Sequence, residues 1–111
     1  MQVQFLEERE RLVARPRGRM EADDGAALAS AIEGRLHAGT KAVTVDLGEL
    51  EFVSLGGIRA ILRLARSLKG ERRELVFARD SDAVREPLHQ AGMDHFFQFS
   101  PPYHPHRGTS A

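Results

Sequence analysis

The chain has 111 residues, which is enough for one folded domain of ordinary size. It contains no cysteine, which excludes disulfides, thiolate metal sites and cysteine nucleophiles. The 16 Lys and Arg residues balance 16 Asp and Glu residues, so the excess positive charge typical of nucleic-acid-binding domains is missing. No apolar run approaches the roughly 20 residues that span a bilayer, and the N-terminus has no segment typical of a signal peptide. We therefore expect a cytoplasmic domain that neither binds nucleic acid directly nor inserts into a membrane.

The N-terminal residues predict two short strands around a charged turn, or one ragged hairpin, because apolar residues within 3–14 lie on both sides of the charged stretch 7–11. Pro16 and Gly18 are then expected to break the chain. A first helix is expected to start at Asp23 or Asp24, since an Asp side chain accepts hydrogen bonds from the free amides of a helix start. The apolar residues that follow at helical spacing are Leu28, Ala31, Ile32 and Leu36. Gly39 is expected to end this helix in a left-handed conformation.

Residues 42–47 form a β-branched, mostly apolar run that predicts a central, buried strand. A second helix is predicted from near Gly57 to Gly70, and 74–78 predicts the next strand. The residues expected to be buried in these elements are Val43, Val45, Leu47, Ile58, Ile61, Leu62, Leu75 and Phe77.

The C-terminal part predicts a third helix capped by Ser81, in which Val84 and Leu88 face inward although Pro87 interrupts the pattern. Residues 96–99 are rich in phenylalanine and predict a last short strand. Residues 1–99 are thus expected to form the domain, and residues 100–111 a flexible tail. Alternating strands and helices predict a single α/β domain with a mixed sheet of four to five strands flanked by about three or more helices.

Residues 46–58 lead from a buried strand through a loop into a helix start and are the most informative stretch. The free amides and the positive dipole end of a helix start can receive an anion or an acidic partner, and Gly56 and Gly57 let a partner's backbone come close. The alternative is that Ser54 only caps the helix and that the glycines only allow a tight turn.

This stretch resembles the loop of the STAS domain family, the anti-sigma-factor antagonists. The family has a strand that ends in a D-L-like pair, followed by a loop of the form F-[IVM]-D-S-S-G-[LI] and a helix. The matching residues here are Asp46-Leu47 and Phe52-Val53-Ser54-Leu55-Gly56-Gly57-Ile58. The order of further family-like segments also agrees, namely Arg17–Met20, Glu74–Phe77, the set Val84, Leu88, Gly92 and Met93, and Phe96–Phe99. The resemblance covers roughly residues 5–99.

The resemblance implies a non-enzymatic module without a cofactor that binds a switch kinase or related anti-sigma factor and so regulates sigma-factor-dependent transcription. It implies a partner-binding surface at the loop and the helix start, made of Ser54, Leu55, Gly56, Gly57, Arg59 and Arg63. The serine that a partner kinase phosphorylates in the family corresponds to Gly56, which has no hydroxyl. Ser54 occupies the family's aspartate position, so its phosphorylation would be out of place, and a capping role is the favoured interpretation.

Several alternatives remain open at this point. A STAS-like domain could instead be a cytoplasmic subunit of a lipid-transport ABC complex, or the chain could be a small enzyme with a site at Asp46 and the Ser54 loop. The exposed cations Arg59, Arg63, Arg66 and Lys69 are either a solvated helix face or a ridge for an acidic partner. The five histidines lack a third ligand at suitable spacing, so no metal site is expected. The oligomeric state is not indicated by the sequence.

Overall fold

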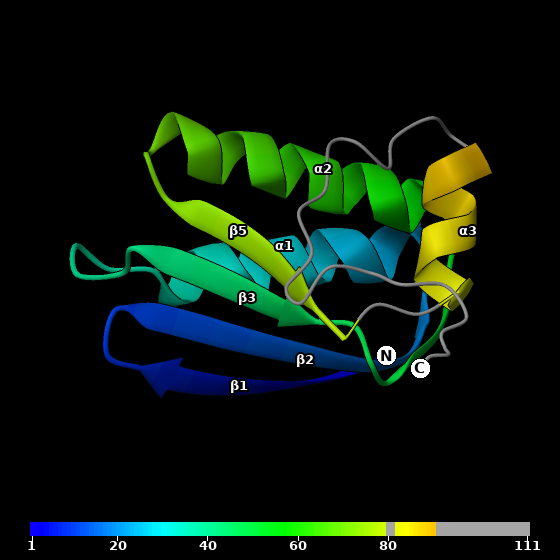
Figure 1. Ribbon diagram of the computed structural model, residues 1–111, viewed down its shortest axis with the longest axis horizontal. Coiled ribbons are helices and arrows are strands. Elements are labelled where there is room, and N and C mark those ends of the chain that lie inside the picture. Colours follow the sequence, from blue (N-terminus) through cyan, green and yellow to red (C-terminus); the bar gives the residue numbers. More distant parts are fainter. Residues whose placement is uncertain (80–81, 91–111) are drawn as a thin grey trace, which may run out of the picture.

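The computed structural model describes residues 1–79 and 82–90 (Figure 1). Its elements in chain order are β1 (Gln2–Glu8), β2 (Arg11–Met20), α1 (Ala22–Arg35), β3 (Ala42–Asp46), β4 (Leu50–Val53), α2 (Leu55–Gly70), β5 (Glu74–Ala78) and α3 (Asp82–Gln90). None of the helices in this described part is long and apolar enough to cross a membrane. The expected strand at 96–99 and the tail at 100–111 lie outside it.

The five strands form one mixed sheet in the order β1-β2-β3-β5, and β4 pairs with the far end of β2. β1 and β2 form the expected antiparallel hairpin, whereas β3, β4 and β5 make parallel pairs. β3 lies between β2 and β5, which confirms the prediction of a central strand. Its Val43 and Val45 are fully buried. The predicted fold class is thus the observed one.

β2 corrects the expectation that Pro16 and Gly18 interrupt the chain, because the strand runs through both residues to Met20. The first part of β2 pairs with β3 up to Ala14, and the last part pairs with β4 from Gly18 onward. Pro16 falls between these two pairings and is buried, so its missing amide interrupts neither of them. Gly18 adopts a φ of 91° at the register shift, a conformation that glycine tolerates best.

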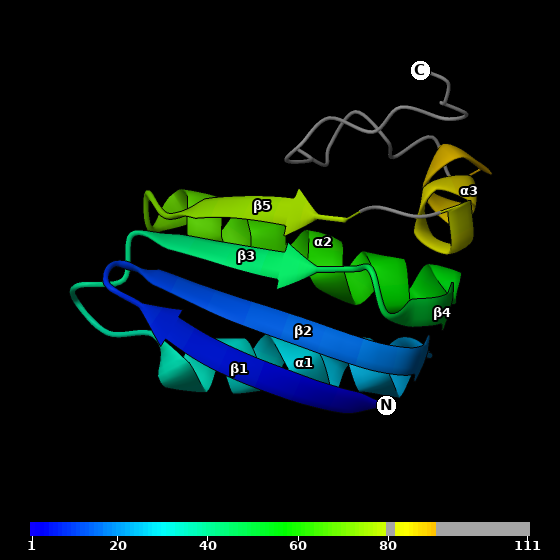
Figure 2. The same ribbon diagram turned by 60° about the horizontal axis from the view of Figure 1, so that its bottom comes forward.

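Both long helices cover the same face of the sheet, with α1 behind β1 and β2 and α2 behind β3 and β5 (Figure 2). Their amino ends lie side by side at the carboxyl ends of the parallel strands, next to α3 (Figure 1). All the residues predicted to be buried are buried except Leu75, which packs against the core while partly exposed. Val84 and Leu88 of α3 also join the core, as expected.

Several element boundaries differ from the predictions. α1 begins at Ala22, and the Asp24 carboxylate accepts a hydrogen bond from the Glu21 amide at 2.9 Å rather than standing before the helix. α1 ends at Arg35, and Gly39 lies in the following turn, where its φ is not positive. The sequence predicts a loop at residues 50–53, but these residues form the strand β4. Ser81, the expected cap of α3, lies outside the described residues.

Candidate protein-docking site

The chain passes from β4 into α2 through Ser54. The Ser54 amide donates a hydrogen bond to the Met20 carbonyl at 2.9 Å, which fixes this junction to the end of β2. The Ser54 hydroxyl accepts a hydrogen bond from the Gly57 amide at 3.0 Å. Ser54 is therefore the N-cap of α2, which confirms the capping interpretation of the loop.

Gly56 and Gly57 serve close packing between the two long helices. A Cβ atom at Gly56 would stand 2.6 Å from the Ala22 Cβ, and one at Gly57 would stand 3.0 Å from the Met20 carbonyl oxygen. On the other helix, a Cβ at Gly25 would stand 3.0 Å from the Gly57 carbonyl oxygen. The amino ends of α1 and α2 therefore touch almost backbone to backbone, and none of these positions has room for a larger side chain.

This packing corrects the expectation that the glycines leave the loop open to a partner's backbone. Gly57 is buried, and Gly56 is half-buried against Ala22. The loop instead presents Leu55, whose side chain is 45% exposed and is one of three large apolar side chains exposed in the described part of the chain. The exposed apolar contact at this end of the molecule thus comes from Leu55 rather than from glycine backbone.

The four cations of α2 all lie on the exposed side of the helix, as predicted, and continue along it from Leu55. We call them the α2 cationic stripe, which consists of Arg59, Arg63, Arg66 and Lys69. None of the four makes an ion pair or a side-chain hydrogen bond with residues 1–79 or 82–90. Two predicted site residues, Arg59 and Arg63, therefore follow Leu55 along the helix, and their guanidinium groups have no partner among the described residues.

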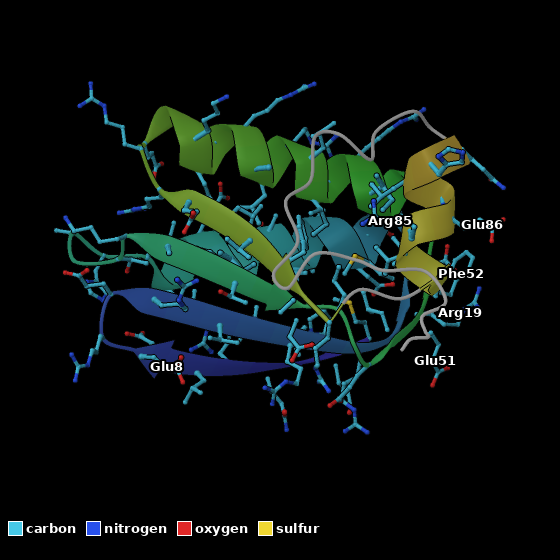
Figure 3. All side chains as sticks on the ribbon, viewed as in Figure 1. Glu8, Arg19, Glu51, Phe52, Arg85 and Glu86 are labelled. Carbon is cyan, nitrogen blue, oxygen red and sulfur yellow. The ribbon has the colours of Figure 1, made fainter. Side chains whose placement is uncertain are left out.

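A pair that the sequence did not single out stands next to the loop. The Arg19 guanidinium lies over the Phe52 ring, 4.1 Å from the ring centroid, a favourable cation–π geometry. Figure 3 shows both side chains at the α3 end of the molecule, with Glu51 beside them and Glu8 at the opposite end. Only the pairing of β4 with β2 brings Arg19 beside Phe52, so no local sequence signal could have shown it.

A second group of charges surrounds Asp46 at the end of β3, and we call it the Asp46 cluster. The Asp46 carboxylate is buried and accepts hydrogen bonds from Arg15 Nε at 3.0 Å, Arg79 Nε at 2.9 Å and the Gly48 amide at 3.0 Å. Arg79 and Arg17 both reach Glu49, at 3.7 and 3.0 Å. The cluster joins the middle of β2 to the carboxyl ends of β3 and β5. Through the Gly48 amide, Asp46 also holds the loop that follows its strand.

The electrostatics of the Asp46 cluster favour the fully ionised state. Burial raises the pKa of the Asp46 carboxyl, but the hydrogen bonds from Arg79, Gly48 and Arg15 outweigh burial and hold that pKa below its ordinary value. The same contact with Asp46 raises the pKa of Arg79. Arg79 has a φ of 54°, which is uncommon for a residue other than glycine, and it lies against Gly48, where a Cβ would stand 2.9 Å from its guanidinium carbon.

The two described histidines, His37 and His89, bring no further site together. Within residues 1–79 and 82–90, no group of three or more His, Asp or Glu side chains is placed to hold a metal ion. The imidazole Nδ1 of His37 accepts a hydrogen bond from the Gly39 amide at 3.0 Å, and His89 is exposed on α3. His95, His104 and His106 lie outside the described residues.

Comparison with known proteins identifies the fold and the domain type. A family model described as MlaB, STAS domain, matches residues 3–99. An anti-sigma-factor antagonist from Mycobacterium paratuberculosis is 22% identical with a TM-score of 0.76, over 91% of this chain and 86% of that chain. A variant of RsbS from Moorella thermoacetica is 15% identical with a TM-score of 0.75, over 93% and 89%.

The anti-sigma-factor antagonist SpoIIAA, a Bacillus protein solved in unphosphorylated and phosphorylated forms, is also similar. Its unphosphorylated form is 18% identical with a TM-score of 0.72, over 88% of this chain and 87% of that chain. No curated protein sequence matches the chain. At these identities the solved structures establish a shared fold, and the family model establishes the domain type over most of the chain.

Proposed function

Since the chain belongs to the STAS domain family, we propose that it is a non-enzymatic, cytoplasmic docking module of the anti-sigma-factor-antagonist type. It binds an anti-sigma factor or a related switch kinase through the start of α2, and so regulates sigma-factor-dependent transcription. The proposal rests on the resemblance of residues 46–58 to the family loop and on the similarity of the fold to two anti-sigma-factor antagonists.

One observation carries the choice of surface. Leu55 offers exposed apolar area at the amino end of α2, and Arg59 and Arg63 follow it with unpaired guanidinium groups within the described part of the chain. An apolar anchor beside free charges is the composition expected of a docking surface, because the apolar contact supplies affinity and the charges guide association.

Binding through this surface proceeds without phosphorylation at the family's usual position. Gly56 has no hydroxyl, and the 2.6 Å distance between a Cβ at this position and the Ala22 Cβ leaves no room for a serine. The Ser54 hydroxyl already accepts the Gly57 amide as the helix cap, so a phosphate there would disturb the first turn of α2. The chain therefore stays permanently in the binding-competent form.

The test is a capture experiment with the full chain expressed in its native cells, followed by cross-linking and mass spectrometry. We expect a kinase-type anti-sigma factor, cross-linked within residues 54–63. Leu55→Asp should weaken capture at least tenfold, because it places charge in the apolar contact, whereas the matched variant Leu6→Asp alters a similarly exposed leucine on β1 and should leave capture unchanged. Capture that survives Leu55→Asp but fails with Leu6→Asp would contradict the proposed surface.

A second candidate function follows from the fact that position 56 has no hydroxyl to phosphorylate and no room for a serine. A subunit of a lipid-transport ABC complex needs a permanent contact with its ATPase and no phosphorylation switch, and a chain without a modifiable loop suits that role equally well. The same capture experiment separates the two functions, because a permease and an ATPase would be recovered in place of an anti-sigma factor.

A further inference from the structure

The α2 cationic stripe is a row of four cations without partners on one helix face, whereas the other cations without a partner in the described part of the chain, such as Arg9, Lys41 and Arg72, lie in turns or at a strand start. By contrast, Arg15 and Arg79 are held by the Asp46 carboxylate, and Arg17 is held by Glu49 in the turn that follows β3. The four cations of the stripe have neither ion pairs nor side-chain hydrogen bonds within residues 1–79 and 82–90. The sequence holds 16 acidic residues, so this absence of partners does not come from a shortage of carboxylates.

The composition of α2 sharpens the contrast. The helix has the sequence LGGIRAILRLARSLKG and contains no Asp or Glu, although surface helices are commonly stabilised by acidic residues three or four positions from basic ones. The stripe instead places like charges at successive steps of four, three and three residues, and such pairs destabilise a helix. A helix face that opposes its own stability in this way suits an acidic group supplied from outside the chain.

The shape of the stripe indicates what kind of acidic group fits. From Arg59 to Lys69 it extends about 15 Å along one helix, and it is about one helix wide. Beside it lies α1, which carries the exposed residues Asp23 and Glu33 and is preceded by the exposed Glu21. The Glu33 carboxylate lies 3.5 Å from the Ser67 hydroxyl of α2. A flat anionic membrane or a nucleic-acid duplex would cover these carboxylates as well and be repelled by them, whereas a single acidic helix lying along α2 would not.

We propose that the α2 cationic stripe, over its whole length to Lys69, binds an acidic α-helix of a partner protein, with Leu55 as the apolar contact at one end. The inference deepens the proposed function, because it extends the docking surface beyond the loop and the helix start and names the partner's chemistry. Acidic residues repeated every three to four positions on the partner helix would face successive cations of the stripe.

The first experiment is a titration of the full ¹⁵N-labelled chain, followed by amide chemical shifts. The probe is a synthetic helical peptide of about 20 residues, long enough to be helical in water, with Glu at every fourth position. We expect shifts concentrated at residues 55–69 and a loss of affinity as salt rises. The same peptide with Gln in place of Glu should cause none of these shifts. Shifts spread over the whole surface, or equal shifts with the Gln peptide, would overturn the inference.

Two further probes test whether the stripe binds an anionic membrane or a nucleic acid instead of an acidic helix. Vesicles of phosphatidylcholine with phosphatidylglycerol, and a DNA duplex, are added to the same protein under the same salt conditions. We expect no binding to either at physiological salt. Binding of vesicles or DNA tighter than binding of the Glu peptide would replace the acidic helix with a membrane or a nucleic acid as the partner.

Matched variants then separate this inference from the proposed function. Arg66→Glu lies in the far half of the stripe and should weaken binding of the Glu peptide about tenfold. Arg9→Glu makes the same charge change at an exposed, unpaired arginine in the β1–β2 turn, near the sheet edge opposite α2, and should change binding less than about twofold. Equal losses of affinity for the Glu peptide in both variants would mean that only the net charge of the protein matters, and this result would overturn the inference. If the captured natural partner binds Arg66→Glu as tightly as the unaltered chain but loses Leu55→Asp, the proposed function stands and the inference fails.

Discussion

The Asp46 cluster and the α2 cationic stripe are both rich in arginine, but within the described residues only the charges of the cluster are neutralised. In the Asp46 cluster, a buried carboxylate accepts hydrogen bonds from two guanidinium groups and a backbone amide, and the contacts join the middle of β2 to the ends of β3 and β5. In the stripe, four exposed cations follow one another along a helix without an acidic neighbour in their own element. The first group of charges therefore holds the fold together, whereas the second is available to another molecule.

Removal of the carboxylate from the Asp46 cluster should have the largest effect on the stability of the fold. We expect Asp46→Ala to lower the free energy of unfolding by about 2–3 kcal/mol, because it removes charge-assisted hydrogen bonds to two arginines and to the Gly48 amide. Arg15 and Arg79 are 38% and 55% exposed and remain hydrated, so the loss is smaller than for a fully buried pair. Urea unfolding of the unaltered chain and of Asp46→Ala measures this loss of unfolding free energy. An unchanged midpoint would mean that the cluster does not stabilise the fold.

A substitution at Gly56 tests whether packing against Ala22 excludes a side chain from this position of the loop. Gly56→Ser should lower the free energy of unfolding by about 2 kcal/mol, because the new Cβ collides with Ala22. Adding Ala22→Gly should recover about half of this loss, although Ala22→Gly alone destabilises the start of α1.

The matched control for Gly56→Ser is Gly34→Ser, in the exposed part of α1, where an added Cβ meets nothing within 4 Å. Serine is a better helix residue than glycine, so this variant should be as stable as the unaltered chain or slightly more stable. Equal losses of unfolding free energy in Gly34→Ser and Gly56→Ser would show that Ala22 does not exclude a side chain at position 56. At position 56, a serine hydroxyl is free of the collision with residue 22, and so open to a kinase, only in the Gly56→Ser, Ala22→Gly double variant.

The pH dependence of stability sharpens the role of Asp46. Its folded-state pKa lies below the ordinary value of 3.8, so the stabilisation by its carboxylate is fully present above that value and is lost as the pH falls through the folded-state pKa. The difference in unfolding free energy between the unaltered chain and Asp46→Asn should therefore be constant near neutral pH and shrink below about pH 4. Urea titrations of both proteins at several pH values measure this difference. A difference that grew on acidification would contradict the ionised cluster.

The sequence predicted those features that depend on neighbouring residues. The β-branched run of β3, the Ser54 cap and the end of α2 at Gly70 are local signals, and all three are found. β4, the course of β2 through Pro16 and the contact of Gly56 with Ala22 depend on pairings between distant segments. For the same reason the sequence showed that Gly56 lacks a hydroxyl but not that a serine would have no room there.

The smallest expected effect concerns the stripe, where stability and binding should change in opposite directions. Arg66→Glu replaces two like-charge pairs, with Arg63 and Lys69 at steps of three residues, by two attractive pairs, so we expect the free energy of unfolding to rise by about 0.5 kcal/mol. Arg66→Gln removes the repulsion without adding attraction, so its gain should be about half as large, and both gains should fade in high salt. Urea unfolding at low and high salt measures these differences. A destabilised Arg66→Glu would mean that Arg66 already has a favourable partner within the chain, and the stripe would then be part of the fold rather than a surface kept free for another protein.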